Sequence, residues 1–366
     1  MTNLTLRHAM GTTQISIACG FDFSQLKTEY SGLRIGLIDS NLLAVLKKNS
    51  ESYLLSVLDH IIEIPEGESS KSFEQYQQVV SQLFDCKADR STTLFSIGGG
   101  VTGDLSGFVA ATFLRGIRYV QIPTTLLSQI DSSIGGKTGI NHPRGKNLLG
   151  AFYQPEQIII DPLFLKSLPQ REVISALGEL VKYTVLNSAE QFEQLSDYLK
   201  NHPANDLLGR DFDRLVEWIE YAVRSKVDVV EKDEREKNIR AFLNLGHTFG
   251  HAVEKYYGYE NVRHGEAVSV GLWFVSYLSF QMNILSRSEF DKISDCLVRL
   301  IPSDKKTKLW NTDEILSYLS VDKKMKQGKL RWIIPHSIGH CEWLDHDDFE
   351  MIKNTAVSFH GKCLKW

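Results

Sequence analysis

The chain of 366 residues lacks the features of a membrane, secreted or nucleic-acid-binding protein. No run of about 18 apolar residues is present, which excludes a transmembrane helix. The first residues, MTNLTLRH, lack the apolar core of a secretory signal. The five cysteines form no CxxC pair, and such an odd, sparse set is typical of a reducing compartment. A net charge of −4 argues against a general nucleic-acid binder, so we expect a cytoplasmic protein without membrane or nucleic-acid partners.

The chain does contain enough apolar sequence for two domains, each with its own core. Apolar residues make up 42% and charged residues 23%, as in typical globular proteins. Before residue 165, β-rich runs alternate with helical patterns, at residues 33–38, 61–64, 93–97, 119–122 and 157–160. Several of these runs are apolar without alternation, which is typical of strands covered on both faces of a parallel sheet. Residues 1–165 are therefore predicted to form an open α/β domain that binds ligands beyond the carboxyl ends of its strands.

Residues 166–366 are predicted to form a second, mainly helical domain. Residues 206–229 carry Leu, Phe, Val and Ile at three- and four-residue intervals, the pattern of an amphipathic helix. A short pair of strands is expected near the end, at residues 330–334 and 340–343.

A glycine-rich segment, IGGGVTGDL at residues 97–105, follows one predicted strand and leads into a predicted helix. In this context backbone amides can approach a pyrophosphate closely. The segment matches neither the GxGxxG fingerprint nor the P-loop, so its spacing leaves the ligand open. A tight strand-to-helix turn is the alternative interpretation of the segment taken alone.

A group of polar residues follows between positions 115 and 147, in sequence that is otherwise apolar or small. Its lysines stand among Gly, Ser and Thr, where backbone amides and ammonium groups can converge on an anion. A solvated loop is the alternative interpretation. The group consists of Arg115, Thr124, Thr125, Asp131, Lys137, Lys146 and Asn147.

The histidines at 247, 251 and 264 form the strongest candidate for a metal or catalytic site. On a helix His247 and His251 would lie one turn apart on the same face, and His264 follows shortly afterwards. Two imidazoles with one carboxylate from elsewhere make an open, three-ligand zinc site that can polarise a substrate oxygen. His336 and His340 have the same spacing, but a proline and a glycine break helical continuity there. Those two are predicted to be structural or surface residues.

Four motifs together resemble 3-dehydroquinate synthase, and the similarity runs from about Asp39 to about Ile338. The motifs are GGGVTGD at 98–104, PTTLLSQIDSSIGGKT at 123–138, GKNLLGAFYQP at 145–155 and NLGHTFGHA at 244–252. The resemblance implies an NAD-binding α/β domain and a mainly helical domain, with the active site between them. It also implies a divalent metal, zinc or cobalt, a homodimer, and a place in the shikimate pathway of aromatic amino-acid biosynthesis.

The reaction that this resemblance implies is the conversion of 3-deoxy-D-arabino-heptulosonate 7-phosphate, a phosphorylated sugar acid, to 3-dehydroquinate and phosphate. NAD takes a hydride from the substrate, phosphate is eliminated, and NADH returns the hydride. Ring opening and an intramolecular aldol closure complete the sequence, so NAD is a catalytic cofactor. Metal bound to two vicinal oxygens would stabilise the alkoxide that loses the hydride. The enzyme would be a phosphate-eliminating carbon–oxygen lyase.

Matched motif by motif, the resemblance also implies the site residues. The metal ligands would be Glu179, His247 and His264, and His251 would belong to a proton-relay network. The cofactor positions would be Asp39, Asn41, Glu68, Lys71, Gly99, Gly100, Val101, Asp104, Thr124, Thr125, Leu127, Asp131, Lys137, Lys146, Phe164, Ser167, Leu168 and Glu172. The substrate positions would be Arg115, Lys137, Asn147, Lys182, Lys226, Arg240, Asn244 and Lys324, with Lys324 preferred to Lys323. The catalytic residues would be His251, Lys137, Lys182, Arg240 and Asn244.

Two of these assignments carry a structural expectation of their own. Arg240 and Asn244 precede His247 by seven and three residues, close to two and one helical turns, so we expect them to face the metal pocket. Glu179 and Lys182 have the spacing of an ordinary helical ion pair, which is the alternative interpretation of that carboxylate.

Two residues depart from the family pattern, which often has alanine at 178 and threonine at 167. Gly178 is expected to loosen its helix by up to about 1 kcal/mol relative to alanine, whereas Ser167 keeps the hydroxyl.

Three other functions remain as alternatives. The nearest is another sugar-phosphate cyclase, above all aminodehydroquinate synthase. Cyclases whose substrates lack the carboxylate, such as 2-deoxy-scyllo-inosose or valiolone-type synthases, tend to change the positions of Arg240 or Asn244, and both residues are retained. The others are an NAD- and metal-dependent polyol dehydrogenase and a non-catalytic NAD-binding protein.

Overall fold

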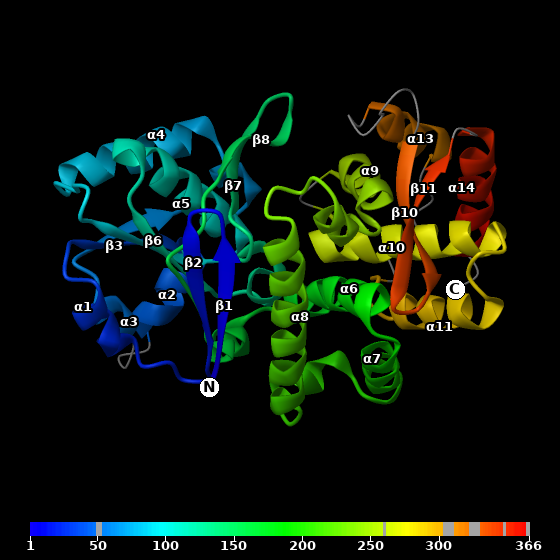
Figure 1. The fold of residues 1–366 in the computed structure, drawn as a ribbon, viewed down its shortest axis with the longest axis horizontal. Helices are drawn as coiled ribbons and strands as arrows, with labels where there is room; N and C mark the ends of the chain where they lie inside the picture. Colours follow the sequence, from blue (N-terminus) through cyan, green and yellow to red (C-terminus); the bar gives the residue numbers. More distant parts are fainter. Residues whose placement is uncertain (49–52, 259–260, 303–310, 322–329, 347–348, 364–366) are drawn as a thin grey trace. The chain divides into compact units, whose positions relative to one another are not determined.

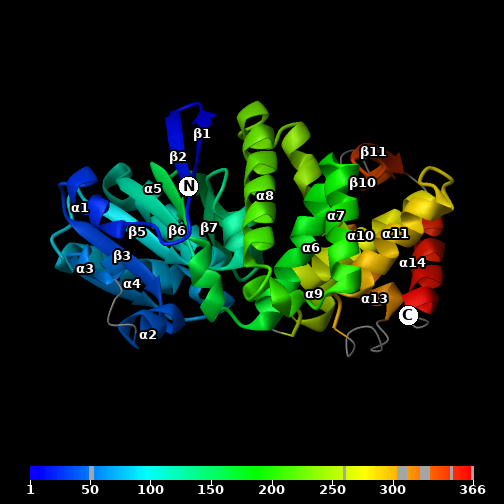
Figure 2. The same ribbon diagram turned by 90° about the horizontal axis from the view of Figure 1, so that it is seen from below.

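The computed structural model describes residues 1–48, 53–258, 261–302, 311–321, 330–346 and 349–363 (Figures 1 and 2). By its internal contacts the chain divides into two compact units. Unit 1 comprises Met1–Pro169 and Asp213–Arg235, and unit 2 comprises Gln170–Phe212 and Glu236–Trp366. Among the helices of the described residues, none is long and apolar enough to span a membrane.

Unit 1 is built on a seven-stranded sheet with the order β1-β2-β9-β6-β5-β3-β4. Its strands are β1 (Thr2–His8), β2 (Gly11–Ile17), β3 (Arg34–Asp39), β4 (His60–Ile64), β5 (Thr93–Gly98), β6 (Arg118–Pro123) and β9 (Gln157–Ile160). β1 and β2 form an antiparallel hairpin, and all other neighbours in the sheet pair in parallel. The five predicted strands and the parallel sheet are confirmed. The N-terminal hairpin was not predicted, because its strands alternate with polar residues and contain no continuous apolar run.

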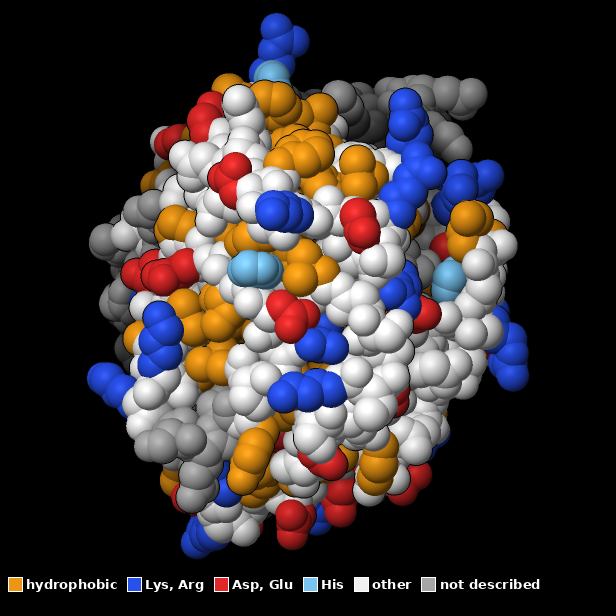
Figure 3. Space-filling model, turned by 90° about the vertical axis from the view of Figure 1, so that its left-hand side faces the viewer, with side chains coloured by type: hydrophobic (Ala, Val, Ile, Leu, Met, Phe, Trp, Pro, Cys, Tyr) orange, Lys and Arg blue, Asp and Glu red, His pale blue; other side chains and the backbone are white. Residues whose placement is uncertain are grey.

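Helices cover both faces of this sheet (Figure 1). They are η1 (Phe23–Gln25), α1 (Leu26–Glu29), α2 (Ser40–Lys48), α3 (Tyr53–Ser56), η2 (Glu68–Ser70), α4 (Phe73–Asp85), α5 (Gly100–Thr112), η3 (Phe113–Arg115), η4 (Ser128–Ser132), η5 (Pro162–Ser167) and most of α8 (Phe212–Lys232). Successive strand residues point to opposite faces, so Leu37 packs in the core of α4 and α5 while Ile38 packs in that of α1, α2 and α3. Burial on both sides explains the uninterrupted apolar runs. On the face of the molecule that Figure 3 shows, acidic and basic side chains are interspersed.

A second sheet of unit 1 is the antiparallel hairpin of β7 (Lys137–His142) and β8 (Gly145–Phe152), which packs against α5. Gly139 and Gly150 lie opposite each other in it, and a Cβ on Gly150 would lie 2.2 Å from the Thr138 carbonyl oxygen. The sequence predicted polar ligand-binding residues here and no strands. Glycine has a low strand propensity, so the close backbone approach that these glycines permit is not visible as a strand pattern.

Helix α8 belongs to unit 1 through residues 213–232, although it follows helices of unit 2 in the sequence. It accepts two hydrogen bonds from β1. Thr2 Oγ1 donates to Glu220 Oε1 at 2.6 Å, and the Arg7 amide donates to Glu231 Oε1 at 2.8 Å. The predicted division at residue 165 assigned this segment to the second domain, and the contacts place it in the first. An amphipathic pattern shows that one helix face is buried but not what covers that face.

Unit 2 is mainly helical. Its helices are α6 (Gln170–Asn187), α7 (Ala189–Asn201), η6 (Ala204–Leu208), η7 (Ile239–Asn244), α9 (His247–Tyr257), α10 (His264–Gln281), α11 (Arg287–Val298), α13 (Thr312–Val321) and α14 (Phe349–Cys363). α10 is the central helix: it contacts α6, α9, α11 and α14, and all its residues from Gly265 to Ser279 are buried. The helix predicted from residue 206 begins only at Phe212, because η6 and a turn come first.

The predicted C-terminal pair of strands is confirmed. β10 (Leu330–Ser337) and β11 (His340–His346) form an antiparallel hairpin. His336 and His340 lie on these strands and are exposed, as predicted for surface residues.

Candidate active site

Three side chains from three helices of unit 2 form a cluster with the composition of a metal site. Glu179 lies in the middle of α6, and His247 and His264 are the first residues of α9 and α10. Their ligand atoms all lie within 4.8 Å of one another. The Nε2 atoms of His247 and His264 are 3.4 and 3.2 Å from Glu179 Oε1. Glu179 and His247 are buried and His264 is partly exposed, so the cluster is most accessible beside His264.

A close crossing of α6 and α10 brings these residues together. A Cβ on Gly265 would lie 1.9 Å from the Ser175 carbonyl oxygen, and a Cβ on Gly178 would lie 2.3 Å from Ser269 Oγ. Each of these glycines is the sequence neighbour of a residue in the cluster, so the crossing sets the distance between the carboxylate and one imidazole. The departure from alanine at position 178 is therefore explained by helix packing.

Gly265→Ala is expected to destabilise unit 2 by about 1–3 kcal/mol, because the new Cβ must push α6 and α10 apart. Zinc affinity should fall as well, since the same movement separates Glu179 from His264. Thermal unfolding and zinc titration measure the two effects. Gly103→Ala, in the first turn of α5, is a matched control, because its Cβ would meet only the flexible amide end of Gln121. A Gly265→Ala protein as stable as the wild type would contradict the tight crossing.

The second nitrogen of each imidazole points away from the cluster. His247 Nδ1 lies 3.2 Å from the Leu245 carbonyl oxygen, and His264 Nδ1 lies 3.2 Å from Glu254 Oε1. Both Nε2 atoms therefore face Glu179. Outer partners of this kind fix the tautomer and orientation of imidazole ligands in metal sites.

The two imidazoles differ in their affinity for protons. Burial lowers the pKa of His247 well below its ordinary value. Burial also lowers the pKa of His264, but hydrogen bonds to Glu179 and Glu254 outweigh it and raise that pKa to about 10. A metal binds the neutral form of an imidazole, so binding here would release a proton from His264.

Lys182 forms an ion pair with Glu179 within α6. Its Nζ lies 2.6 Å from Glu179 Oε2, and both side chains are almost fully buried. The ion pair that was the alternative interpretation of these residues is thus present. It uses Oε2, while Oε1 is directed at the two imidazoles, so Glu179 belongs to both arrangements.

His251 lies beside the cluster on α9 and is exposed. Its ring centroid is 5.5 Å from that of His247 and 6.3 Å from that of His264. With Glu254 and His264 it forms a second group whose ligand atoms lie within 4.8 Å of one another. The two groups share His264, so the exclusion of His251 from the ligands stays a prediction.

The predicted helical continuity from Arg240 to His247 is wrong. Arg240 and Asn244 lie on the 3-10 helix η7, and Gly246 has a φ of 79° before α9 begins. A residue in the left-handed backbone conformation interrupts an α-helix. Counting helical turns back from His247 therefore does not locate these side chains. η7 nevertheless contacts α6. Arg240 is buried there, and Asn244 Nδ2 donates to Glu236 Oε1 at 2.5 Å.

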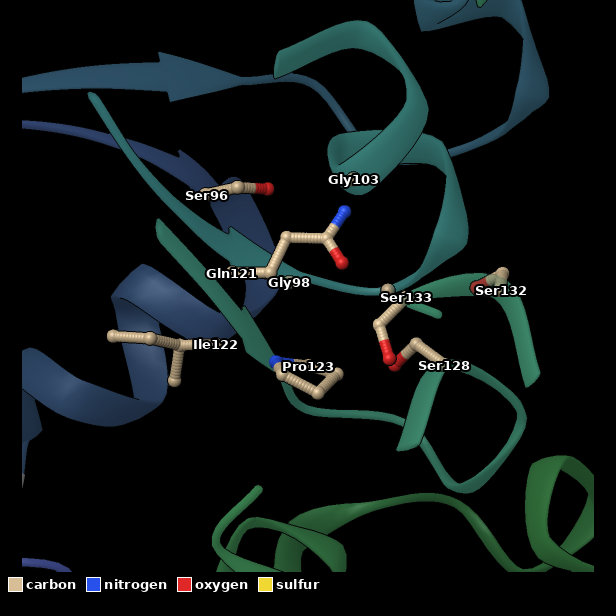
Figure 4. Close-up of a pocket in the computed structure, with 10 residues that line it drawn as sticks. Ser96, Gly98, Gly103, Gln121, Ile122, Pro123, Ser128, Ser132 and Ser133 are labelled. Atoms are coloured by element: carbon tan, nitrogen blue, oxygen red, sulfur yellow. The ribbon is translucent and has the colours of Figure 1, made fainter. Parts of the chain in front are cut away.

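In unit 1 the glycine-rich segment joins β5 to α5, as predicted. The N-cap residue of α5 is Gly99, which has no side chain to cap the helix, and a Cβ on Gly100 would lie 3.0 Å from Ser132 Oγ. Figure 4 shows the Gln121 amide directed toward Gly103, beside a cavity of about 10 Å³, room for about one water molecule. Uncapped amides at the start of a helix are suited to bind a phosphate.

Lys71 is the centre of a charged cluster beside α5. Its Nζ lies 2.7 Å from Asp104 Oδ2, 3.7 Å from Glu68 Oε1 and 2.5 Å from Asn147 Oδ1. Burial lowers the pKa of Lys71, but the carboxylates of Asp104 and Glu68 outweigh it and raise the pKa above its ordinary value. Asp104, Lys137 and Asn147 line a cavity of about 350 Å³. Three predicted residues thus line a cavity of ligand size: Asp104 was predicted to bind the cofactor, Asn147 the substrate, and Lys137 both.

Two further pairs of predicted residues meet in unit 1. Lys226 Nζ lies 2.6 Å from both the carbonyl oxygen and Oδ1 of Asp131, which joins a predicted substrate residue to a predicted cofactor residue. Asp39 ends β3, accepts a hydrogen bond from the Asn41 amide, and has its pKa raised by burial.

The remaining predicted residues of unit 1 lie at or after the carboxyl ends of strands or on the β7–β8 hairpin, with one exception. They are Gly99, Val101, Thr124, Thr125, Leu127, Lys146, Phe164, Ser167 and Leu168. The exception is Arg115, which is exposed. α5 returns from the carboxyl end of β5 to the amino end of the parallel strand β6, so Arg115 lies at the opposite edge of the sheet. The structure therefore does not bring Arg115 to the other residues of its predicted group.

Of the remaining predicted residues, one cofactor residue lies in unit 2 and one substrate residue lies outside the described residues. Glu172, predicted to bind the cofactor, lies on α6 in unit 2, where its Oε1 is 2.8 Å from Arg263 Nε. Lys324, predicted to bind substrate, lies outside the described residues, as does Lys323.

Comparisons with known proteins show the family. Profiles for the N-terminal and C-terminal parts of 3-dehydroquinate synthase match residues 61–175 and 176–325. The 3-dehydroquinate synthase of Rippkaea orientalis is 39% identical over 363 residues, 94% of each chain. That of Dictyoglomus turgidum is 42% identical over 296 residues, 81% of each chain. The chain belongs to the 3-dehydroquinate synthase family.

Family membership confirms the predicted resemblance, the predicted fold class and the predicted enzyme class. This 3-dehydroquinate synthase family member is an enzyme of the shikimate pathway, a phosphate-eliminating lyase. Solved structures agree on the fold. The 2-epi-5-epi-valiolone synthase of Streptomyces hygroscopicus, with NAD⁺ and Zn²⁺ bound, has a TM-score of 0.85 at 24% identity and covers 96% of this chain and 97% of its own. A 2-deoxy-scyllo-inosose synthase with carbaglucose-6-phosphate, NAD⁺ and Co²⁺ has a TM-score of 0.83 at 22% identity, over 98% and 99%.

Two buried carboxylates near the cluster were not predicted. Glu254 bonds to His264, and Glu266 accepts two bonds from Arg171, at 2.7 and 2.9 Å, and one from the Arg263 amide at 3.0 Å. Glu266 thereby fixes the first turn of α10. Both had a sequence signal. Glu254 stands two helical turns after the first histidine of α9, and Glu266 has the spacing of a capping box.

Proposed function

We propose that Glu179, His247 and His264 hold the divalent metal, zinc or cobalt, with which this enzyme forms 3-dehydroquinate. The observation that carries the proposal is the convergence of one carboxylate and two imidazole Nε2 atoms from three helices. These donors fit the ion, because three protein ligands with one accessible side make up a catalytic zinc site. When bound, the metal supplies Lewis acidity that polarises hydroxyl oxygens of the substrate.

NAD is the proposed cofactor of unit 1. The uncapped start of α5 fits its pyrophosphate, and Asp39 at the end of β3 fits a ribose, which needs a hydrogen-bond acceptor. The nicotinamide supplies reversible hydride transfer. Beside α5, Lys71 supplies a positive charge, Asp104 a negative charge and Asn147 an amide, and the last two residues line the cavity.

The proposed substrate is 3-deoxy-D-arabino-heptulosonate 7-phosphate, whose phosphate and carboxylate both require cationic partners. In unit 2, Arg240 binds the carboxylate of the substrate, and Asn244 forms a hydrogen bond with a ring hydroxyl. Lys182 contacts the substrate beside Glu179. Burial of Arg240 and Lys182 supports this, because a buried cation gains most from an anionic ligand. The other proposed substrate residues are Lys137, Asn147, Lys226 and Lys324. The proposal for Arg115 rests on the family resemblance alone, because within the chain Arg115 lies at the opposite edge of the sheet from the other residues of its predicted group.

His251 is the proposed proton carrier. It is exposed on α9, one turn after His247, and an imidazole can both accept and donate a proton near neutral pH. The substrate phosphate can itself accept the proton whose loss accompanies elimination. The protein then has to orient the ring and exclude water during the intermediate steps.

The enzyme is further proposed to work in the cytoplasm as a homodimer. The free cysteines among the described residues, Cys19, Cys86, Cys296 and Cys341, support a reducing compartment. Sedimentation of the purified protein measures the oligomeric state.

Cofactor turnover tests the proposed function. With zinc and NAD far below the substrate concentration, the purified enzyme is expected to release phosphate from all of the heptulosonate phosphate, because the hydride leaves and returns within one cycle. Phosphate assay and NADH absorbance follow the reaction. Accumulation of one NADH per substrate consumed would support a polyol dehydrogenase instead. Consumption of an aminated substrate in preference to the heptulosonate phosphate would support aminodehydroquinate synthase.

A further inference from the structure

We infer that Glu254 is a positioning residue for the metal site: its carboxylate accepts the Nδ1 proton of His264 and so holds the Nε2 of that ring toward Glu179. The inference rests on the proposed metal site and assigns a role to a residue outside the ligand set. Its basis is the 3.2 Å distance between His264 Nδ1 and Glu254 Oε1.

His264 lies between two carboxylates, and its neighbours decide which of them faces the metal. Its Nε2 is 3.2 Å from Glu179 Oε1 and its Nδ1 is 3.2 Å from Glu254 Oε1. His247 shows which of the two carboxylates lies on the metal side. Because its Nδ1 bonds to a backbone carbonyl, only its Nε2 can bind a metal, and that atom lies 3.4 Å from Glu179 Oε1. The metal therefore belongs on the Glu179 side of His264, and Glu254 lies behind the ligand.

Burial makes the bond to Glu254 effective. Glu254 is 6% exposed, and a carboxylate removed from water is a stronger hydrogen-bond acceptor than an exposed one. α9 provides both His247, at its first residue, and Glu254, two turns later. The same rigid helix thus supplies one ligand directly and orients the other, which is the outer carboxylate–histidine arrangement of many zinc sites.

The second candidate group, His251 with Glu254 and His264, would require the opposite arrangement. There Glu254 would be a ligand and His264 would bind through Nδ1, with no role for His247 or Glu179. His251 is exposed, whereas Glu179 and His247 are buried. The proposed arrangement uses both buried residues.

The test measures zinc affinity of the full-length protein by competition with a chelator, for wild type, Glu254→Gln and Glu254→Ala. Loss of an outer carboxylate costs about 10- to 100-fold in metal affinity, so Glu254→Ala should weaken binding by about that factor. Glu254→Gln, which keeps an acceptor oxygen without the charge, should weaken binding less. The thermal midpoint of the metal-free variants separates this effect from damage to the fold. His251→Ala is the matched control and should keep wild-type zinc affinity.

Nitrogen-15 NMR of labelled histidine rings gives a readout that altered stability would not produce. In the zinc-bound wild type, His264 is expected to bind through Nε2 and to keep its proton on Nδ1. Wild-type zinc affinity in Glu254→Ala, or zinc on Nδ1, would overturn the inference. If Glu179→Ala and His247→Ala keep zinc while Glu254→Ala and His251→Ala lose it, the proposed ligand set fails too. If zinc is lost only from the Glu179 and His247 variants, that set stands and the role of Glu254 fails.

Discussion

Glu179→Ala and His247→Ala are each expected to lose bound zinc on dialysis and with it at least about a thousandfold of the activity. The size follows from the several kcal/mol of charge stabilisation that a Lewis-acid metal contributes to a transition state. Both residues are buried in the cluster, and their donor atoms lie 3.4 Å apart, so water cannot readily replace either. Metal analysis of the dialysed proteins and phosphate release at saturating NAD measure the two effects.

His251→Ala is the control for this experiment, because its ring lies beside the cluster without belonging to the proposed ligands. It should keep its zinc while its proton transfer slows. Zinc loss from this variant equal to that from His247→Ala would show that the ion binds in the group formed with Glu254. Circular dichroism of each metal-free variant establishes that the fold is retained.

Arg240→Ala is expected to lower kcat/KM by about a hundredfold or more, equivalent to about 3 kcal/mol, since the substrate carboxylate loses its proposed buried partner. Arg240 is 2% exposed, so water is poorly placed to substitute for the guanidinium. Zinc and NAD binding should remain at wild-type levels, because Arg240 belongs to neither proposed site. Steady-state kinetics with the heptulosonate phosphate, together with the two binding measurements, test the expectation.

Arg240→Lys is the matched variant for this position. It keeps the charge but loses the paired donors of the guanidinium. Its kcat/KM should therefore lie between those of the wild type and of Arg240→Ala. Sugar phosphates without a carboxylate complete the test. A wild-type enzyme that prefers glucose 6-phosphate or sedoheptulose 7-phosphate would contradict the assignment of Arg240 to a carboxylate.

The elements that carry a strong local signal could be predicted from the sequence. The five parallel strands of unit 1 were each located within one residue at their ends. β3, β5, β6 and β9 are buried on both faces, which gives them largely apolar runs, whereas β4 lies at the edge of the sheet and has exposed residues among buried ones. The residues of the metal cluster stand in motifs whose spacing the helices α6, α9 and α10 preserve. Their convergence in space was predicted only through the family resemblance.

Other features depend on backbone conformation or on distant contacts, and the sequence does not display these. Gly246 separates η7 from α9 through one left-handed residue, so Arg240 could not be placed by counting helical turns. Arg115 stands in a polar group in sequence, but α5 carries the chain to the opposite edge of the sheet. Glu254 is the single acidic residue of α9 and stands two turns after His247, but its contact with His264, on another helix, is visible only in the structure.

The assignment of residues 213–235 to unit 1 has a consequence for synthesis of the chain on the ribosome. The nascent polypeptide exposes Asp131 and β1 long before their partners Lys226, Glu220 and Glu231 leave the exit tunnel. Domains generally fold as units during translation. Unit 1 can therefore reach its final state only after about two thirds of the protein has been made, and a fragment ending at Pro169 would emerge without the helix that closes it.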